Sequence, residues 1–390
     1  MKHIPKIDKF FLSLNLFLIS IHILFLALLI KTLYPIHFME ENLFFFDLLS
    51  KPLHIPYWLI IICTNINILS LSFIGKLIWG SREWVILPAL YVLNPWTPYL
   101  ASLNSFYIYL ASLILIMILG FIFIKSTNHW IGAVISIFAG VLLLYSSLII
   151  FIIFPLMVIG IIILRLFSKN EIKKLSFWII LFCVPLFMAI FKNSVGWENI
   201  YRNEVTILSE EGFLNDVNKF QGQAQKRGFR LLSKVAENRY VYFAKYASLK
   251  IIKNLTPATY FTPQEKLASF SFSPPIFLGF ILPFLFGLYS LLKSTQSAKF
   301  LGLSLILIIP SLLSKQIVDL NRLVIFSPII FYAISYGLIN LYRSKKFSFR
   351  IILFLTIILV FIQMFVTISD IYLRETIRFD KTSGINFEIK

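Results

Sequence analysis

Acidic side chains gather in the first polar segment of the chain. Residues 31–56 follow an opening apolar run and contain Glu40, Glu41 and Asp47. A carboxylate at the edge of an apolar region meets both water and apolar groups, which can tune its pKa and let it act as a general base. The alternative for Glu40 and Glu41 is a pair of ordinary solvated loop acids, and Asp47 can instead mark a helix that lies on an interface.

A second group of candidate residues is basic. Arg322 opens an apolar run and follows Asp319 by three positions. A guanidinium group suits bidentate contact with a phosphate, so Arg322 is the leading candidate for an anion-binding residue. The alternative is an anchor at the start of a helix, paired with Asp319. Weaker candidates for phosphate binding are Lys315, Arg239 and Arg202.

Motifs for soluble cofactor chemistry are missing from the sequence. There is no Walker A phosphate loop, no Rossmann fingerprint, no H-E-x-x-H, no C-x-x-C and no D-x-D. Both cysteines, Cys63 and Cys183, fall inside apolar runs, which is typical of buried thiols. The sequence therefore predicts no cluster of metal ligands and no nucleotide site.

Composition favours a membrane protein. Hydrophobic residues make up 58% of the 390 positions, 14% of the residues are charged, and the mean hydropathy is +0.85. A soluble domain carries about a quarter charged residues. The net charge of +18 would favour nucleic acid in a soluble protein. Because the basic residues here lie mostly between apolar runs, we expect a lipid bilayer as partner and no nucleic acid.

About eleven apolar runs divide the chain, each close to the length that crosses a bilayer. A backbone in lipid has to satisfy its own hydrogen bonds, so each run predicts a helix. The expected fold is an all-α membrane protein, a polytopic bundle of about eleven transmembrane helices. The runs cover approximately residues 10–30, 57–78, 84–101, 105–124, 130–146, 148–167, 176–191, 275–292, 300–314, 323–341 and 350–369.

The distribution of basic residues predicts the orientation of these helices. Loops with many basic residues alternate with short loops that have few. The basic residues of these short loops are Lys31, Lys51, Lys315 and Arg322. Basic loops stay in the cytoplasm. We therefore expect a multi-pass protein of the plasma (inner) membrane, with its N-terminus in the cytoplasm and the acidic segment outside.

This layout predicts three regions. Residues 1–191 form an N-terminal transmembrane module of about seven helices. Residues 192–274 form a long outer loop with two amphipathic helices, at about 212–235 and 237–254. Residues 275–390 form a C-terminal module of about four helices with a short outer tail.

The stretch Gly75–Lys125 contains a basic turn at Gly80–Arg82, an Asn94–Pro95–Trp96 turn and a helix that ends at Lys125. In these features it resembles the core of the GT-C fold membrane glycosyltransferases. It is most similar to the branch of the protein mannosyltransferases and aminoarabinose transferases, glycosyltransferase family 39. The later segment Asn238–Tyr240 resembles bacterial members of this group.

The resemblance implies an activity. A hexose or pentose carried on a polyprenyl phosphate would be transferred, with inversion, to a lipid, glycan or protein acceptor of the cell envelope at the outer membrane face. A carboxylate among Glu40, Glu41 and Asp47 would act as general base, and basic residues would stabilise the leaving phosphate. No cofactor is certain, and a divalent metal ion stays open because members of the group differ in their use of one.

Other functions remain open. The group has an Asp-Glu pair where this chain has Glu40–Glu41, and the segment from this pair to Gly80 is shorter than in the group. A non-catalytic scaffold of the same fold is therefore one alternative. A transporter or lipid flippase is another, although ion-coupled carriers usually keep ionisable residues within their spans. Here His22 is one of very few, and we interpret it as an interhelical hydrogen-bonding group.

Overall fold

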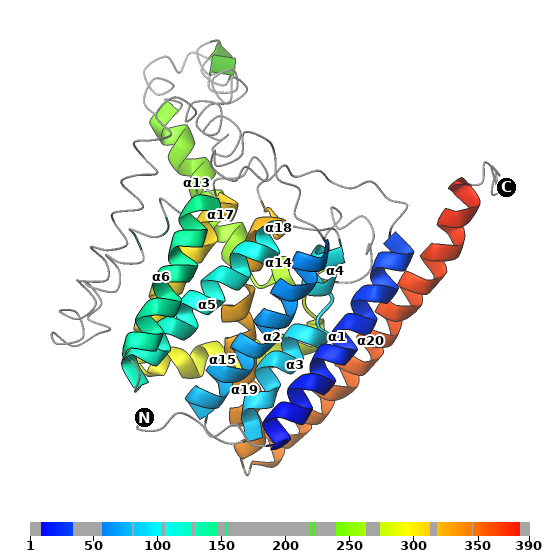
Figure 1. Cartoon of the computed structure of the whole chain (residues 1–390). Coiled ribbons are helices and arrows are strands. Elements are labelled where there is room, and N and C mark those ends of the chain that lie inside the picture. The colour runs from blue at the N-terminus through cyan, green and yellow to red at the C-terminus, as the bar shows by residue number, and fades with distance from the viewer. Residues whose placement is uncertain are drawn as a thin grey trace.

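The computed structural model describes the chain in nine main segments. Within them every regular element is a helix, as the apolar runs predict. The helices pack into one bundle in which early and late parts of the chain lie against each other (Figure 1). The described segments are residues 9–33, 57–79, 82–102, 106–126, 129–146, 239–262, 274–312, 318–344 and 346–382, with a few single positions between 153 and 226.

Four apolar helices form the first half of the bundle: α1 (Lys9–Leu33), α2 (Tyr57–Trp79), α5 (Phe106–Ser126) and α6 (His129–Ser146). Helices α1 and α2 run in opposite directions, so the last residue of α1 and the first residue of α2 lie at the same end of the bundle (Figure 1). The acidic segment between these two helices lies outside the described residues, but both of its attachment points are at this end.

The apolar run at 84–101 is broken, so the prediction of a single helix there is wrong. Three shorter elements replace it: η1 (Arg82–Val85), α3 (Ile86–Leu93) and α4 (Trp96–Ser102). The chain leaves the helical conformation at Asn94, which is extended at φ −80° and ψ 144°.

Pro95 explains this break, because a proline disfavours the helical conformation of the residue before it. The polar groups exposed by the break are largely paired. The side-chain oxygen of Asn94 accepts from the backbone N–H of Trp96 at 2.7 Å, and the hydroxyl of Thr97 donates to the carbonyl of Tyr91 at 2.9 Å.

The second half of the bundle contains several short helices and two long ones. The helical stretches Leu278–Lys293 and Ser297–Leu312 meet at a bend of 115°. The elements are η2 (Leu278–Phe280), α15 (Ile281–Lys293), α16 (Thr295–Ser304), η3 (Leu305–Ile308), α17 (Ile309–Leu312), α18 (Leu320–Leu323), η4 (Val324–Phe326), α19 (Ser327–Arg343) and α20 (Phe347–Thr382).

Between these halves lie α13 (Arg239–Leu255) and α14 (Ala258–Phe261). Helix α13 confirms the predicted helix over 237–254. The amphipathic helix predicted over 212–235 lies outside the described residues except for single positions. The region boundary predicted near residue 191 also lies outside them.

Among the described residues, three helices are long and apolar enough to cross a membrane, and the bent pair would be a fourth crossing if it is one span. The fold is therefore compatible with a membrane protein. The predicted number of about eleven spans is not confirmed, and the runs at 148–167 and 176–191 lie almost wholly outside the described residues. The three helices are Trp58–Trp79, Leu320–Arg343 and Phe347–Ser369; shorter apolar helices are Phe10–Leu24, Tyr107–Phe123 and Trp130–Leu143.

Polar side chains inside the bundle join neighbouring helices. The hydroxyl of Ser72 donates to Asn15 at 2.6 Å, and the amide of Asn67 donates to the hydroxyl of Tyr91 at 2.9 Å. His22 is fully buried near Tyr91, with ring centroids 6.1 Å apart. Neither ring nitrogen of His22 has a partner in the part of the chain that the structure describes, so the hydrogen bond expected for it is not seen.

An ion pair fastens η1 to the end of α19. The Nε of Arg343 donates to Glu83 at 2.8 Å, and a second guanidinium nitrogen pairs with the other carboxylate oxygen. Arg343 is more than half exposed, so we expect this pair to contribute little stability by itself. The contact shows that η1 and the end of α19 lie side by side.

Two glycines allow α15 and α19 to touch through their backbones. A Cβ atom at Gly287 would lie 1.9 Å from the carbonyl oxygen of Ala333, and one at Gly337 would lie 1.9 Å from that of Pro283. No side chain can occupy these positions without moving one helix away from the other. Close contact of this kind is a common way to join apolar helices.

We predict that Gly337→Ala destabilises the protein by about 1–3 kcal/mol, the usual cost of overpacking a tight contact. Thermal unfolding in detergent, followed by loss of a monodisperse elution peak, measures the effect. Gly302→Ala in α16 is the matched control, because a Cβ there meets nothing within 4 Å. Equal melting temperatures for the two variants would contradict the close contact.

Candidate functional site

The structure describes the side-chain surroundings of one predicted site residue, Arg322. Arg239 is the first residue of α13, and its side chain is not described. The other predicted site residues lie outside the described residues, so their roles stay predictions: Glu40, Glu41, Asp47, Lys315 and Arg202.

Arg322 is held in place by Asp319. The carboxylate of Asp319 lies 3.2 Å from the Nε of Arg322, and its other oxygen accepts the backbone N–H of Arg322 at 3.2 Å, which caps α18. The guanidinium also donates to the carbonyl of Pro310 at 3.4 Å and lies over the ring of Tyr107 at 5.6 Å. The pairing with Asp319 that the sequence left open is therefore present, and Arg322 is oriented rather than freely mobile.

Helix α13 brings two further polar side chains to the same place. The side-chain oxygen of Asn254 accepts from the hydroxyl of Ser311 at 2.6 Å, and the oxygen of that hydroxyl accepts from the backbone N–H of Asp319 at 3.2 Å. Lys250 lies one turn earlier on α13, and its ammonium group donates to the carbonyl of Leu312 at 3.4 Å. Both α13 side chains are almost completely buried, at 1% exposure for Lys250 and 0% for Asn254.

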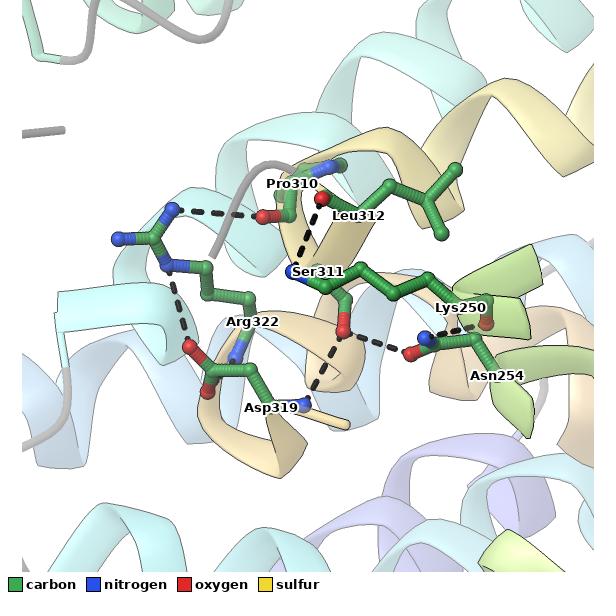
Figure 2. A network of polar contacts seen from close by, with 7 residues as sticks. All are labelled: Lys250, Asn254, Pro310, Ser311, Leu312, Asp319 and Arg322. Atoms are coloured by element: carbon green, nitrogen blue, oxygen red, sulfur yellow. Dashed lines mark hydrogen bonds and ion pairs between the residues drawn. The ribbon is translucent and has the colours of Figure 1, made fainter. Parts of the chain in front are cut away.

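We call the group formed by Lys250, Asn254, Ser311, Asp319 and Arg322 the polar junction (Figure 2). It contains two cationic groups and one carboxylate, drawn from α13, α17 and the start of α18. A buried charge is costly unless it is paired or hydrogen-bonded. Each of the three charged groups is accordingly held by polar partners, among them the contacts described above.

Aromatic side chains border the polar junction. The hydroxyl of Tyr260 in α14 donates to the backbone carbonyl of Asn254, and burial raises the pKa of the Tyr260 phenol, so the group remains a neutral donor. Trp96 in α4 packs against Tyr260 with ring centroids 5.9 Å apart, and its indole N–H donates to the carbonyl of Leu320 at 3.2 Å. These contacts connect the break in the run 84–101 to the junction.

The junction lies at the end of the bundle to which the acidic segment is attached. Helix α4, which carries Trp96, packs against α1, and α1 ends at Leu33 on this side (Figure 1). The segment that holds Glu40, Glu41 and Asp47 therefore starts at the same end of the molecule as Lys250 and Arg322.

Asn254 begins an Asn-Leu-Thr triplet, the pattern of a glycosylation acceptor. In the structure its amide nitrogen donates to the carbonyl of Lys250 at 2.8 Å, and the side chain is fully buried. An oligosaccharide could not reach this nitrogen in the folded protein. We therefore interpret Asn254 as a residue that packs inside the protein and not as a glycosylation site.

Sequence reasoning missed Lys250, Ser311 and Tyr260 as members of the site. The only local signal was the four-residue spacing of Lys250 and Asn254, which places both on one face of a helix. Among the described residues no group of three His, Cys, Asp or Glu side chains could hold a metal ion.

We predict that Asn254→Ala lowers stability by about 1–3 kcal/mol, because it leaves the buried Ser311 hydroxyl without its acceptor. Thr256→Ala is the matched control. It also destroys the glycosylation pattern, yet it removes only a local bond from Thr256 to the carbonyl of Ile252. Thermal unfolding should separate the two variants, and similar losses in both would assign the effect to the triplet instead.

No protein-family model matches the chain, and no curated protein matches it. The assignment of a function therefore depends on the geometry and on the sequence.

Proposed function

We propose that the chain is a membrane glycosyltransferase that takes a sugar from a polyprenyl-phosphate donor at the end of the bundle that carries the polar junction. The observation that supports this most directly is a pair of cationic groups, the buried Lys250 and the partly buried Arg322, brought together from segments far apart in the sequence. The resemblance of Gly75–Lys125 to GT-C fold enzymes supports the same proposal.

In the proposed reaction, a carboxylate among Glu40, Glu41 and Asp47 removes the proton from the acceptor hydroxyl. The resulting oxygen nucleophile attacks the anomeric carbon of the donor, with inversion, and the bond from that carbon to the lipid phosphate breaks. Arg322, Lys315, Arg239 and Arg202 are the proposed partners of the leaving phosphate. The acceptor would be a lipid, glycan or protein.

Lys250 is added to the proposed phosphate partners on the basis of its position. In the view of Figure 2 its side chain extends from α13 past Ser311 toward the side of Arg322, and its ammonium group donates to the carbonyl of Leu312 at 3.4 Å. A lysine is a compact point charge and a guanidinium a planar fork, so the two can contact different oxygens of one phosphate. The ring of Tyr246, 4.9 Å from the Lys250 ammonium, restricts where this charge can move.

Replacement of the proposed base tests the chemistry. Glu40→Gln combined with Glu41→Gln should reduce release of polyprenyl phosphate from labelled polyprenyl-phosphate hexoses or pentoses at least about 100-fold, because general base catalysis is lost. The control is Glu171→Gln, a carboxylate in a segment expected in the cytoplasm. Proteoliposomes carry the donor lipid, and chromatography of the lipids measures the product.

Unchanged release in the double variant would remove Glu40 and Glu41 from the mechanism. Asp47→Asn would then be the next variant. Absence of release by the unaltered protein with every donor would favour the alternative of a non-catalytic scaffold. Binding of polyprenyl phosphate itself, weakened about tenfold or more by Arg322→Gln, tests the phosphate site separately from the base.

A transporter or lipid flippase is a second candidate, favoured by one observation. His22 and the side-chain oxygen of Asn67 are buried between helices, and neither has a hydrogen-bond partner for these atoms among the described residues. Polar groups inside an apolar bundle can mark a path for a polar substrate. Movement of a fluorescent lipid across a vesicle bilayer without any bond cleavage would favour this candidate over the enzyme.

The proposed location is the plasma (inner) membrane, with a cytoplasmic N-terminus and the segment 192–274 outside. We predict that a reporter active only in the cytoplasm functions when it is fused to Met1, whereas one active only outside functions when it is fused after Lys390. An odd number of spans requires this result. Activity of the same reporter at both ends would contradict the proposed orientation and number of spans together.

A further inference from the structure

Helix α13 has two of its polar side chains turned toward the protein. Lys250 and Asn254, four residues apart, lie on one face, and both are buried against α17. The hydroxyl of Ser311 donates to the side-chain oxygen of Asn254 there, and the ammonium group of Lys250 donates to the carbonyl of Leu312. The face that packs on the rest of the bundle is therefore hydrophilic at its centre.

The opposite side of α13 is exposed, and in the last two turns of the helix it is mainly aliphatic. The exposed fractions are 42% for Leu249, 43% for Ile251, 63% for Ile252 and 41% for Leu255. A helix on the surface of a soluble protein shows the reverse pattern, with its apolar stripe toward the core. Apolar area left in water costs about 25 cal/mol per Å². The outward side of α13 is thus suited to an apolar solvent.

The position of α13 relative to the apolar helices also fits contact with lipid. Its polar face touches Ser311 and Leu312, which end the bent pair of apolar helices. Ser311 also bonds to Asp319, the residue immediately before the apolar span Leu320–Arg343. The last turns of α13 therefore lie at the level where two apolar stretches end.

The charges of α13 fit the boundary of a bilayer. The helix contains Arg239, Lys245, Lys250 and Lys253 and no acidic residue, and Lys245 and Lys253 are exposed. Amphipathic helices that lie in the headgroup region commonly combine an apolar side with basic residues. A protein interface fits less well, because the exposed residues from Leu249 to Leu255 include no aromatic side chain, and binding hot spots are rich in Trp, Tyr and Arg.

We propose that the outward side of α13 is a lipid-binding surface, on which acyl chains of one bilayer leaflet contact Leu249, Ile252 and Leu255. The helix then separates lipid on its outer side from the polar junction on its inner side. This inference does not depend on the catalytic role proposed above, because it uses only the exposure and position of α13.

Spin labels placed on the full-length protein in phosphatidylcholine–phosphatidylglycerol vesicles test the proposal. After replacement of Cys63 and Cys183 by alanine, cysteine is introduced by Ile252→Cys, and collision of the label with oxygen and with a water-soluble nickel chelate is measured. Phe361→Cys, on the exposed apolar face of α20 at 68% exposure, supplies the lipid reference. Thr295→Cys, exposed at the start of α16, supplies the water reference.

The expected result is a shift of the ratio of oxygen to nickel collisions at position 252 away from the Thr295 value and toward the Phe361 value. A ratio equal to that at Thr295 would mean that water covers α13, and would overturn the proposal. Low collision rates with both reagents would also overturn it, because they would mean that a segment of this chain or a second protein covers the helix. Leu249→Cys repeats the measurement at a second outward position.

Discussion

The hydroxyl group of Ser311 holds the polar junction together, because it bonds to both sides of it. It donates to Asn254 on α13 and accepts from the backbone of Asp319, which in turn fixes Arg322. The group is fully buried, so each of these partners is needed to balance the loss of water. The two segments that carry the cationic groups are thus joined through one small side chain at the end of α17.

Much of the helical layout could be predicted from the sequence. A long apolar run in lipid can pair its backbone N–H and C=O groups within the same segment only as a helix. Helices such as α2 and α20 can therefore be predicted from composition alone. The run at 84–101 was mispredicted as one helix although Pro95 lies inside it. Apolar content does not distinguish a continuous helix from two short ones. The polar bonds of Asn94 and Thr97 that support the break become visible only in three dimensions.

The site was less predictable than the fold. The three-residue spacing of Asp319 and Arg322 indicated their pairing, because residues at this spacing meet on one turn. Asn254 and Ser311 are 57 residues apart, and no local pattern connects them. The sequence also did not indicate which side of α13 faces the protein. Helical periodicity shows that a helix has a polar and an apolar side, but which side faces the protein depends on what surrounds the helix.

The contacts between distant segments also have a consequence for folding during synthesis. Glu83 is paired with Arg343, 260 positions later, and the indole of Trp96 is bonded to the carbonyl of Leu320, 224 positions later. During synthesis these early groups emerge from the ribosome long before their partners exist. The first helices must therefore wait, in an incomplete arrangement, until the final third of the chain has been translated. A chain that stops before residue 320 would leave the indole N–H of Trp96 without this acceptor.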